Sequence, residues 1–184
     1  DTANGAGSLS YPDIFRDLDW EMIPLFMEPD GTFPNHEANP LLEENLVDLK
    51  KKVVEVGADL GAAIDGDADR CMFVDAGGNT MRADVIGAVV ALEILKHNPG
   101  ETFLYDLRST RAFPLDVEAN GGKAIQCRVG HAFIKNQMRD HNAIFAAELS
   151  GHFYFREHYF TESSAIALIR IMNLMHETGK PLAE

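Results

Sequence analysis

The sequence predicts an α/β protein built from two consecutive three-layer α/β domains with mixed, largely parallel sheets. Short apolar runs of about five residues alternate with segments of helical period, which is the pattern of βαβ units. Two such series follow one another along the 184 residues, and the turn Gly77-Gly78-Asn79 lies between them. We therefore expect one domain over residues 1–79 and a second over residues 80–184.

The first series begins on a helix, and we interpret its domain as lacking the opening strand. A polar loop over residues 29–40 contains three prolines and is long enough to have a functional role. Gly57 follows the second helix as expected for a residue just past a helix end. The predicted elements are a helix over 12–18, a strand over 21–26, a helix over 43–56, and strands over 58–64 and 72–75.

The second series is more complete and alternates regularly between helices and strands. Asn98-Pro99-Gly100 ends its first helix, and Gly121-Gly122 ends its second. The predicted helices cover 84–96, 111–118, 132–140 and 163–177, and the predicted strands cover 102–105, 123–127, 143–147 and 152–155.

Composition restricts the classes of partner. A formal net charge of −13 argues against nucleic acid or an anionic membrane, because both require a basic surface. No apolar stretch approaches the roughly 20 residues of a membrane-spanning helix, and the first residues do not resemble a secretory signal. The two cysteines, Cys71 and Cys127, are not in a paired spacing and are expected to be buried thiols. These features predict a cytoplasmic protein.

The most informative segment is the acidic loop Asp65-Gly66-Asp67-Ala68-Asp69-Arg70, which follows a predicted buried strand. Ligands of α/β proteins gather beyond the carboxyl ends of strands, and hard divalent cations prefer several oxygen ligands. Small residues at 66 and 68 let the loop curl, so that Asp65, Asp67 and Asp69 converge on one cation. Without a counter-ion, three neighbouring carboxylates repel one another.

Other kinds of loop also contain closely spaced carboxylates. A solvated acidic turn remains open. An EF-hand fails, because the sixth and twelfth positions counted from Asp65 hold Arg70 and Ala76 instead of glycine and glutamate. A phosphatase of the haloacid-dehalogenase type also begins with a strand and Asp-x-Asp, although that family normally has Thr or Val where Asp69 stands, and it stays as an alternative.

Three motifs in order resemble the α-D-phosphohexomutases. The loop DGDADR is similar to their metal loop, usually DGDGDR, with Ala68 replacing glycine. Upstream, residues 29–36, Asn39-Pro40 and Glu44-Asn45 look like the stretch ahead of the metal strand. Downstream, residues 148–152 resemble the GEMSGH sugar loop of the phosphomannomutase/phosphoglucomutase branch, although alanine replaces its first glycine.

The resemblance implies a set of site residues. Asp65, Asp67 and Asp69 would hold Mg²⁺, and Arg70 would offset charge on the moving phosphoryl group. Glu148 and Ser150 would bind sugar hydroxyls, the glutamate in bidentate fashion. His152 would lie near the reacting oxygen, where an imidazole can exchange a proton near neutral pH. A purely structural histidine remains the alternative for His152.

Two further segments place cations at predicted strand ends. Residues 128–131 resemble a Lys/Arg-x-Gly-His loop of the family and make His131 a candidate for substrate binding. Residues 106–111 resemble a strand end that often carries lysine where Arg108 stands. A guanidinium suits phosphate because its fork can contact two oxygens. Either segment can also be an ordinary surface turn with salt-bridged arginines.

The resemblance also implies what this chain lacks. The family transfers phosphoryl groups through a phosphoserine in a Thr-Ala-Ser-His-Asn-Pro-like loop, and residues 97–99 (His-Asn-Pro) have no such serine. The phosphate-binding loop of the last domain is missing too. We therefore expect the second and third of four domains, inactive alone, whose partners are the flanking domains, a hexose phosphate and a hexose 1,6-bisphosphate. A non-catalytic sugar-phosphate-binding module is the competing class.

Overall fold

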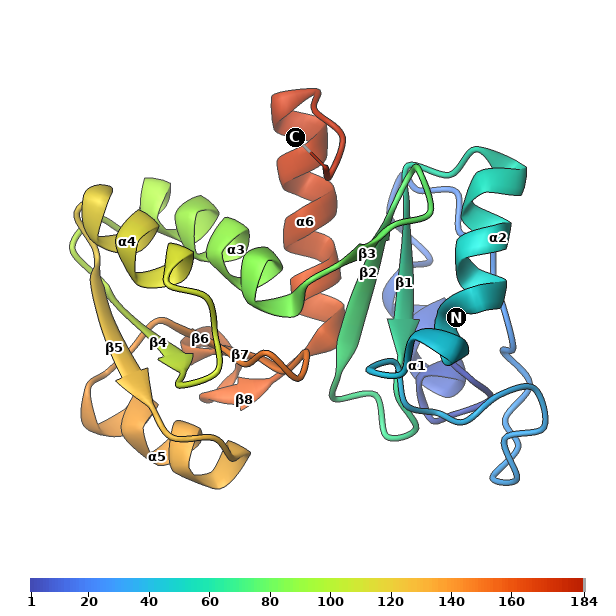
Figure 1. The fold of residues 1–184 in the computed structure, drawn as a ribbon, viewed down its shortest axis with the longest axis horizontal. Coiled ribbons are helices and arrows are strands. Elements are labelled where there is room, and N and C mark those ends of the chain that lie inside the picture. The colour runs from blue at the N-terminus through green and yellow to red at the C-terminus, as the bar shows by residue number, and fades with distance from the viewer. Residues whose placement is uncertain (184) are drawn as a thin grey trace.

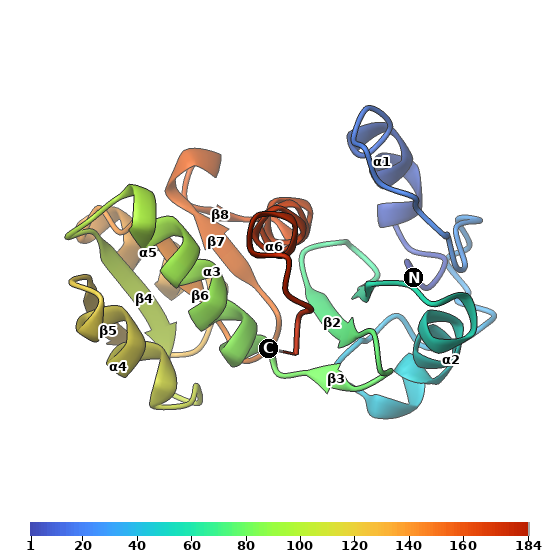
Figure 2. The same ribbon diagram turned by 90° about the horizontal axis from the view of Figure 1, so that it is seen from above.

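The computed structural model describes residues 1–183 and shows two α/β units on either side of a long helix, α6 (Ser164–Thr178) (Figure 1). Seen from above, α6 lies end-on between the two sheets (Figure 2). Within residues 1–183, no helix is both long enough and apolar enough to cross a membrane. Both cysteines are buried thiols, as expected.

The first unit is a three-stranded sheet with one covering helix. Its strands are β1 (Leu60–Ile64), β2 (Cys71–Asp75) and β3 (Thr80–Met81), in the order β1-β2-β3. Helix α2 (Val47–Val56) follows a 3₁₀ turn, η1 (Glu43–Leu46), and packs Leu49 and Val53 on the sheet. Gly61 permits this close packing, because a Cβ there would lie 2.6 Å from a Val53 methyl group.

All strand pairs of this first sheet are antiparallel, whereas we predicted largely parallel sheets. The reason lies in the connection between β1 and β2. It is the short acidic loop, and a parallel pair requires a crossover of a dozen or more residues. The prediction of two α/β domains is confirmed, but parallel pairing occurs only in the second unit among the described strands.

Two other predictions for the first unit differ from the structure: one helix has other bounds, and one strand is not formed. The first helix is α1 (Gly7–Ile14), with Pro12 inside it, rather than residues 12–18. Residues 21–26 do not form a strand. The carbonyls of Leu25 and Phe26 instead accept single hydrogen bonds from the backbone of Thr2 and Asn4, at 3.3 and 2.8 Å.

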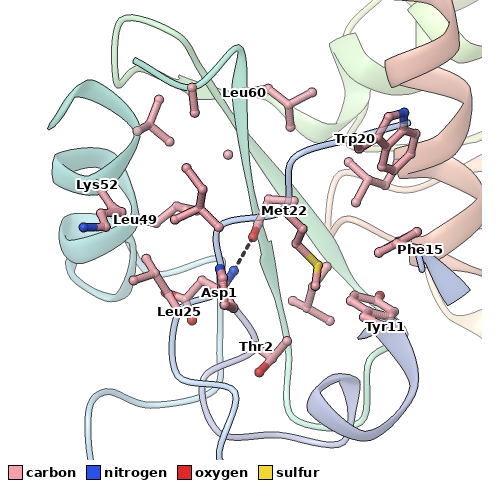
Figure 3. A pocket seen from close by; sticks show the side chains of 18 of the residues that line it. Asp1, Thr2, Tyr11, Phe15, Trp20, Met22, Leu25, Leu49, Lys52 and Leu60 are labelled. Atoms are coloured by element: carbon pink, nitrogen blue, oxygen red, sulfur yellow. Dashed lines mark hydrogen bonds between the residues drawn. The ribbon is translucent and has the colours of Figure 1, made fainter. Parts of the chain in front are cut away.

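The outer edge of β1 is bordered by the first residue of the chain (Figure 3). The amino group of Asp1 donates to the Ala62 carbonyl at 2.9 Å, and the Ile64 amide donates to the Asp1 carbonyl at 2.9 Å. A cavity of about 160 Å³ adjoins this edge. Its lining is largely apolar and includes Tyr11, Trp20, Met22, Leu25, Leu49 and Leu60.

The second unit is a five-stranded mixed sheet covered on both faces. Its order is β5-β4-β6-β7-β8; the first three strands are parallel, and β7 and β8 are antiparallel to their neighbours. The strands are β4 (Thr102–Asp106), β5 (Lys123–Cys127), β6 (Phe145–Ala147), β7 (Phe153–Phe155) and β8 (Thr161–Glu162).

Side chains alternate between the two faces of this sheet. Phe103 and Phe145 join the core beneath α3 (Ala83–His97) and α4 (Ala112–Ala119), whereas Leu104 and Ala146 pack under α5 (His131–Asp140). Every predicted element of this unit is present within a few residues of its expected bounds. Strand β8, only two residues long, was not predicted.

The hydrophobic core is continuous between the units. The rings of Phe73, in β2, and Phe153, in β7, have centroids 6.3 Å apart. The Cys71 amide donates to the Gly151 carbonyl at 3.0 Å, and residues Arg70 and His152 form an antiparallel bridge. This contact brings the loop after β1 against the loop between β6 and β7.

Candidate functional site

The structure brings the three aspartates of the acidic loop together. Asp65 directly follows β1 and is buried, Asp67 is exposed, and Asp69 is intermediate. One oxygen from each carboxylate lies within 4.8 Å of the others. The side chains therefore converge as predicted rather than separate into solvent.

Local backbone geometry produces this convergence. Ala68 adopts a φ of +68°, in the left-handed region that favours glycine, and its amide donates to the Asp65 carbonyl at 3.2 Å. The Gly66 amide donates to the Ala38 carbonyl at 3.2 Å, so the polar loop over 29–40 supports the acidic loop. On the other side, a Cβ at Gly5 would lie 2.8 Å from the Gly66 carbonyl oxygen.

Arg70 is anchored to the buried aspartate of this cluster. Its Nε donates to Asp65 Oδ2 at 2.5 Å, and its backbone amide donates to Oδ1 at 3.1 Å. Burial raises the pKa of Asp65, and the hydrogen bonds from Arg70 oppose that effect. The Arg70 side chain remains 26% exposed, so it lies at the rim of the acidic loop.

His152 lies between the two loops and links two carboxylates. Its Nε2 is 3.3 Å from Asp69 Oδ2, and its Nδ1 is 3.1 Å from Glu148 Oε2. Burial alone would lower the pKa of His152, but the two carboxylates raise it to about 9. The hydrogen bond with His152 in turn lowers the pKa of Asp69. The two carboxylates therefore favour the protonated form of the imidazole.

Glu148 is almost completely buried at the end of β6. Tyr154 donates its hydroxyl proton to Oε2 at 2.7 Å, and the Gly130 amide donates to Oε1 at 3.3 Å. Burial acts to raise the pKa of Glu148, but the hydrogen bonds from His152 and Tyr154 outweigh it, and the pKa is lowered. Ser150 lies beside His152, with its Oγ 3.0 Å from His152 Nδ1.

Arg108 joins the same cluster through a buried aspartate. Its Nη2 donates to Asp106 Oδ2 at 2.7 Å and lies 3.8 Å from Glu148 Oε1. The Leu149 amide also donates to Asp106 Oδ2, at 3.0 Å. Asp106 thus fixes both Arg108 and the backbone of the predicted sugar loop. Sequence reasoning assigned it no role, although its position at the end of a buried strand was a usable signal.

His131 is the one predicted site residue that the structure does not place in this cluster. Its side chain is 61% exposed at the start of α5, and its Nδ1 lies 4.0 Å from Glu162. The neighbouring Gly130 reaches Glu148 instead, through its amide. Tyr154 was missed altogether as a functional candidate, because a buried tyrosine within an apolar strand pattern reads as core.

Comparison with known proteins agrees with this arrangement. The family model for phosphoglucomutase/phosphomannomutase α/β/α domain II matches residues 1–78, and the model for domain III matches residues 82–184. Among curated relatives, a phosphomannomutase of Methanocaldococcus jannaschii is 41% identical over 184 residues, which are 100% of this chain and 41% of that protein. A phosphomannomutase/phosphoglucomutase of Pseudomonas syringae is 42% identical over 160 residues, 87% of this chain and 34% of the relative.

A solved structure gives the same result. The crystal structure of a phosphoglucomutase/phosphomannomutase family protein from Burkholderia thailandensis superposes with a TM-score of 0.95 at 32% identity. The match covers 100% of this chain and 40% of that one. The two α/β units correspond to domains II and III of the phosphoglucomutase/phosphomannomutase family. The chain belongs to the phosphoglucomutase/phosphomannomutase family, and it spans about two fifths of the length of the M. jannaschii relative.

Proposed function

We propose that this chain supplies the metal loop and the sugar loop of an enzyme that interconverts hexose 1-phosphates and hexose 6-phosphates of mannose or glucose. The convergence of Asp65, Asp67 and Asp69 beside His152 and Glu148 carries the proposal. Residues 1–79 act as the second domain and residues 80–184 as the third. The phosphoserine that donates the phosphoryl group lies outside these residues, in a flanking domain.

The acidic loop has the donor set expected for Mg²⁺. Magnesium is a hard cation that prefers oxygen ligands, carboxylates among them. The three carboxylates offer oxygens that all lie within 4.8 Å of one another, so Asp65, Asp67 and Asp69 would hold the ion together. When bound, the ion supplies positive charge that stabilises the phosphoryl group during transfer.

The residues around the ion perform the remaining tasks. Arg70, held by Asp65 and partly exposed, presents a fixed positive charge to the phosphoryl oxygens. Glu148 and Ser150 orient the sugar through its hydroxyls, and Arg108 adds a guanidinium for substrate oxygens. His152 contacts both Asp69 and Glu148, and its protonated form balances the charge of these two carboxylates. Hexose phosphate and hexose 1,6-bisphosphate are the ligands this constellation fits.

The state of the two cysteines indicates the cellular compartment. Cys71 and Cys127 are free thiols inside the structure. Unpaired thiols are typical of a reducing compartment. We therefore place the protein in the cytoplasm.

One experiment tests the function. The longer protein that contains residues 1–184 is assayed for interconversion of mannose or glucose 1-phosphate and 6-phosphate with Mg²⁺. Asp67→Asn is expected to lower kcat by at least about a hundredfold, because the charge stabilisation supplied by the ion is lost. Asp59→Asn makes the same change in charge at an exposed position and should leave the rate unchanged.

Each outcome has a definite meaning. Full activity in Asp67→Asn would exclude the metal role of the loop. Binding of hexose phosphate without any turnover by the longer protein would favour the non-catalytic binding module. Release of inorganic phosphate in place of isomerised product would favour the phosphatase alternative.

A further inference from the structure

Tyr154 approaches the site from inside the apolar core. It pairs with Ala146 across β6 and β7, so its side chain lies on the face covered by α5. The ring is fully buried among Leu104, Ile134 and Met138. Its hydroxyl donates to Glu148 Oε2 at 2.7 Å. A buried hydroxyl aimed at a buried carboxylate holds that carboxylate in one orientation.

The two oxygens of Glu148 are engaged unequally. Oε2 carries the hydrogen bond from Tyr154 and the ion pair with His152 Nδ1, at 2.7 and 3.1 Å. Oε1 carries one longer hydrogen bond, from the Gly130 amide at 3.3 Å, and faces Arg108 at 3.8 Å. Each carboxylate oxygen has two acceptor sites. The spare acceptor capacity therefore lies on Oε1, next to the guanidinium.

We infer that Tyr154 is a positioning residue for substrate recognition: its hydroxyl occupies Oε2 of Glu148 and thereby presents Oε1 alone to a sugar hydroxyl. The inference rests on the proposed function and departs from the bidentate contact expected from the sequence. One hydroxyl of the sugar is bound by Glu148, in a direction set by Tyr154. The tyrosine does not contact the sugar; it acts through the glutamate.

The test uses the longer protein with Tyr154→Phe, which removes the hydroxyl and keeps the ring in the core. Without that donor Glu148 keeps only its contacts with His152, Gly130 and Arg108, so its carboxylate is held less firmly toward the bound hydroxyl. KM for glucose 1-phosphate is expected to rise about tenfold, with kcat within about twofold of the parent, because the lost contact serves bound substrate and transition state alike. Tyr105→Phe is the matched control, since no hydrogen bond to the Tyr105 hydroxyl exists among the described residues.

A second readout separates positioning from general loosening of the structure. Monodeoxy analogues of glucose 1-phosphate, each lacking one hydroxyl, are compared in the parent and in Tyr154→Phe. In the parent, removal of the hydroxyl bound by Glu148 should raise KM about tenfold. In Tyr154→Phe, that penalty should largely disappear for this analogue alone. Equal losses for every analogue, or an unchanged KM for glucose 1-phosphate, would overturn the inference.

A binding measurement tests the role of Tyr154 even if the proposed mutase activity is not found. If the parent protein shows no turnover, binding of glucose 1-phosphate is measured by calorimetry in the parent and in Tyr154→Phe. A tenfold weaker Kd in the variant still supports the role of Tyr154, although the mutase proposal has failed. An identical Kd, or no binding to either protein, rejects the role of Tyr154.

Discussion

The ion-pair contacts of His152 predict a specific dependence of stability on pH. Its pKa is raised from 6.5 to about 9 in the folded protein, against the effect of burial, by Asp69 and Glu148. A tenfold difference in proton affinity corresponds to about 1.4 kcal/mol. The protonated imidazole therefore adds up to about 3 kcal/mol to the free energy of unfolding. Because the folded pKa is the higher one, this stabilisation is fully present below pH 6.5 and is lost as pH rises through about 9.

The assay is urea unfolding of the parent and of His152→Gln at several pH values between 5.5 and about 10, in the presence of a chelator so that no metal competes for Asp69. The stability difference between the two proteins should be largest at the acid end and shrink toward pH 10. His158→Gln replaces an exposed histidine and serves as the control. Parallel stability curves for parent and His152→Gln would refute the reasoning, because they would mean that the imidazole titrates alike in the folded and unfolded states.

Two further predictions concern backbone and packing. Ala68→Gly should raise the free energy of unfolding by up to about 1 kcal/mol, because φ at this position is +68° and glycine adopts it without strain; chemical denaturation measures this, and a clear loss of stability would contradict it. Gly87→Ala should destabilise the second unit by about 1–3 kcal/mol, because the new Cβ would lie 2.5 Å from the Ala147 Cβ in β6. Thermal unfolding tests this second change, with Gly31→Ala, which meets no atom within 4 Å, as the control.

The local structure could be predicted from the sequence wherever a short segment determines its own conformation. The alternation of small residues and carboxylates over 65–70 predicted the curled loop, and the regular alternation of the second unit predicted its elements within a few residues. The strand over 21–26 failed for the opposite reason. Its apolar residues fit a strand pattern, but a strand also requires a partner along its length, and only two backbone bonds to residues 2 and 4 are formed.

Contacts between distant segments were not predictable from local patterns. His152 and Asp69 are 83 positions apart, and their 3.3 Å contact depends on how the two sheets pack. The role of Asp106 was missed for a related reason: it is a buried carboxylate, and the Leu149 amide that donates to it lies 43 positions away. The acidic loop is one continuous segment, so its chemistry could be predicted from the sequence. The contacts that support Glu148 depend on the folded structure and could not.

The two units are joined by the contact between the rings of Phe73 and Phe153 and by the hydrogen bond from the Cys71 amide to the Gly151 carbonyl. Asp65, Asp67, Asp69 and Glu148 therefore belong to one continuously packed body, and the packing of the two units determines the distance between the acidic loop and the glutamate. Under the proposed function, a sugar phosphate whose length matches that distance is bound, and one of a different length is bound more weakly.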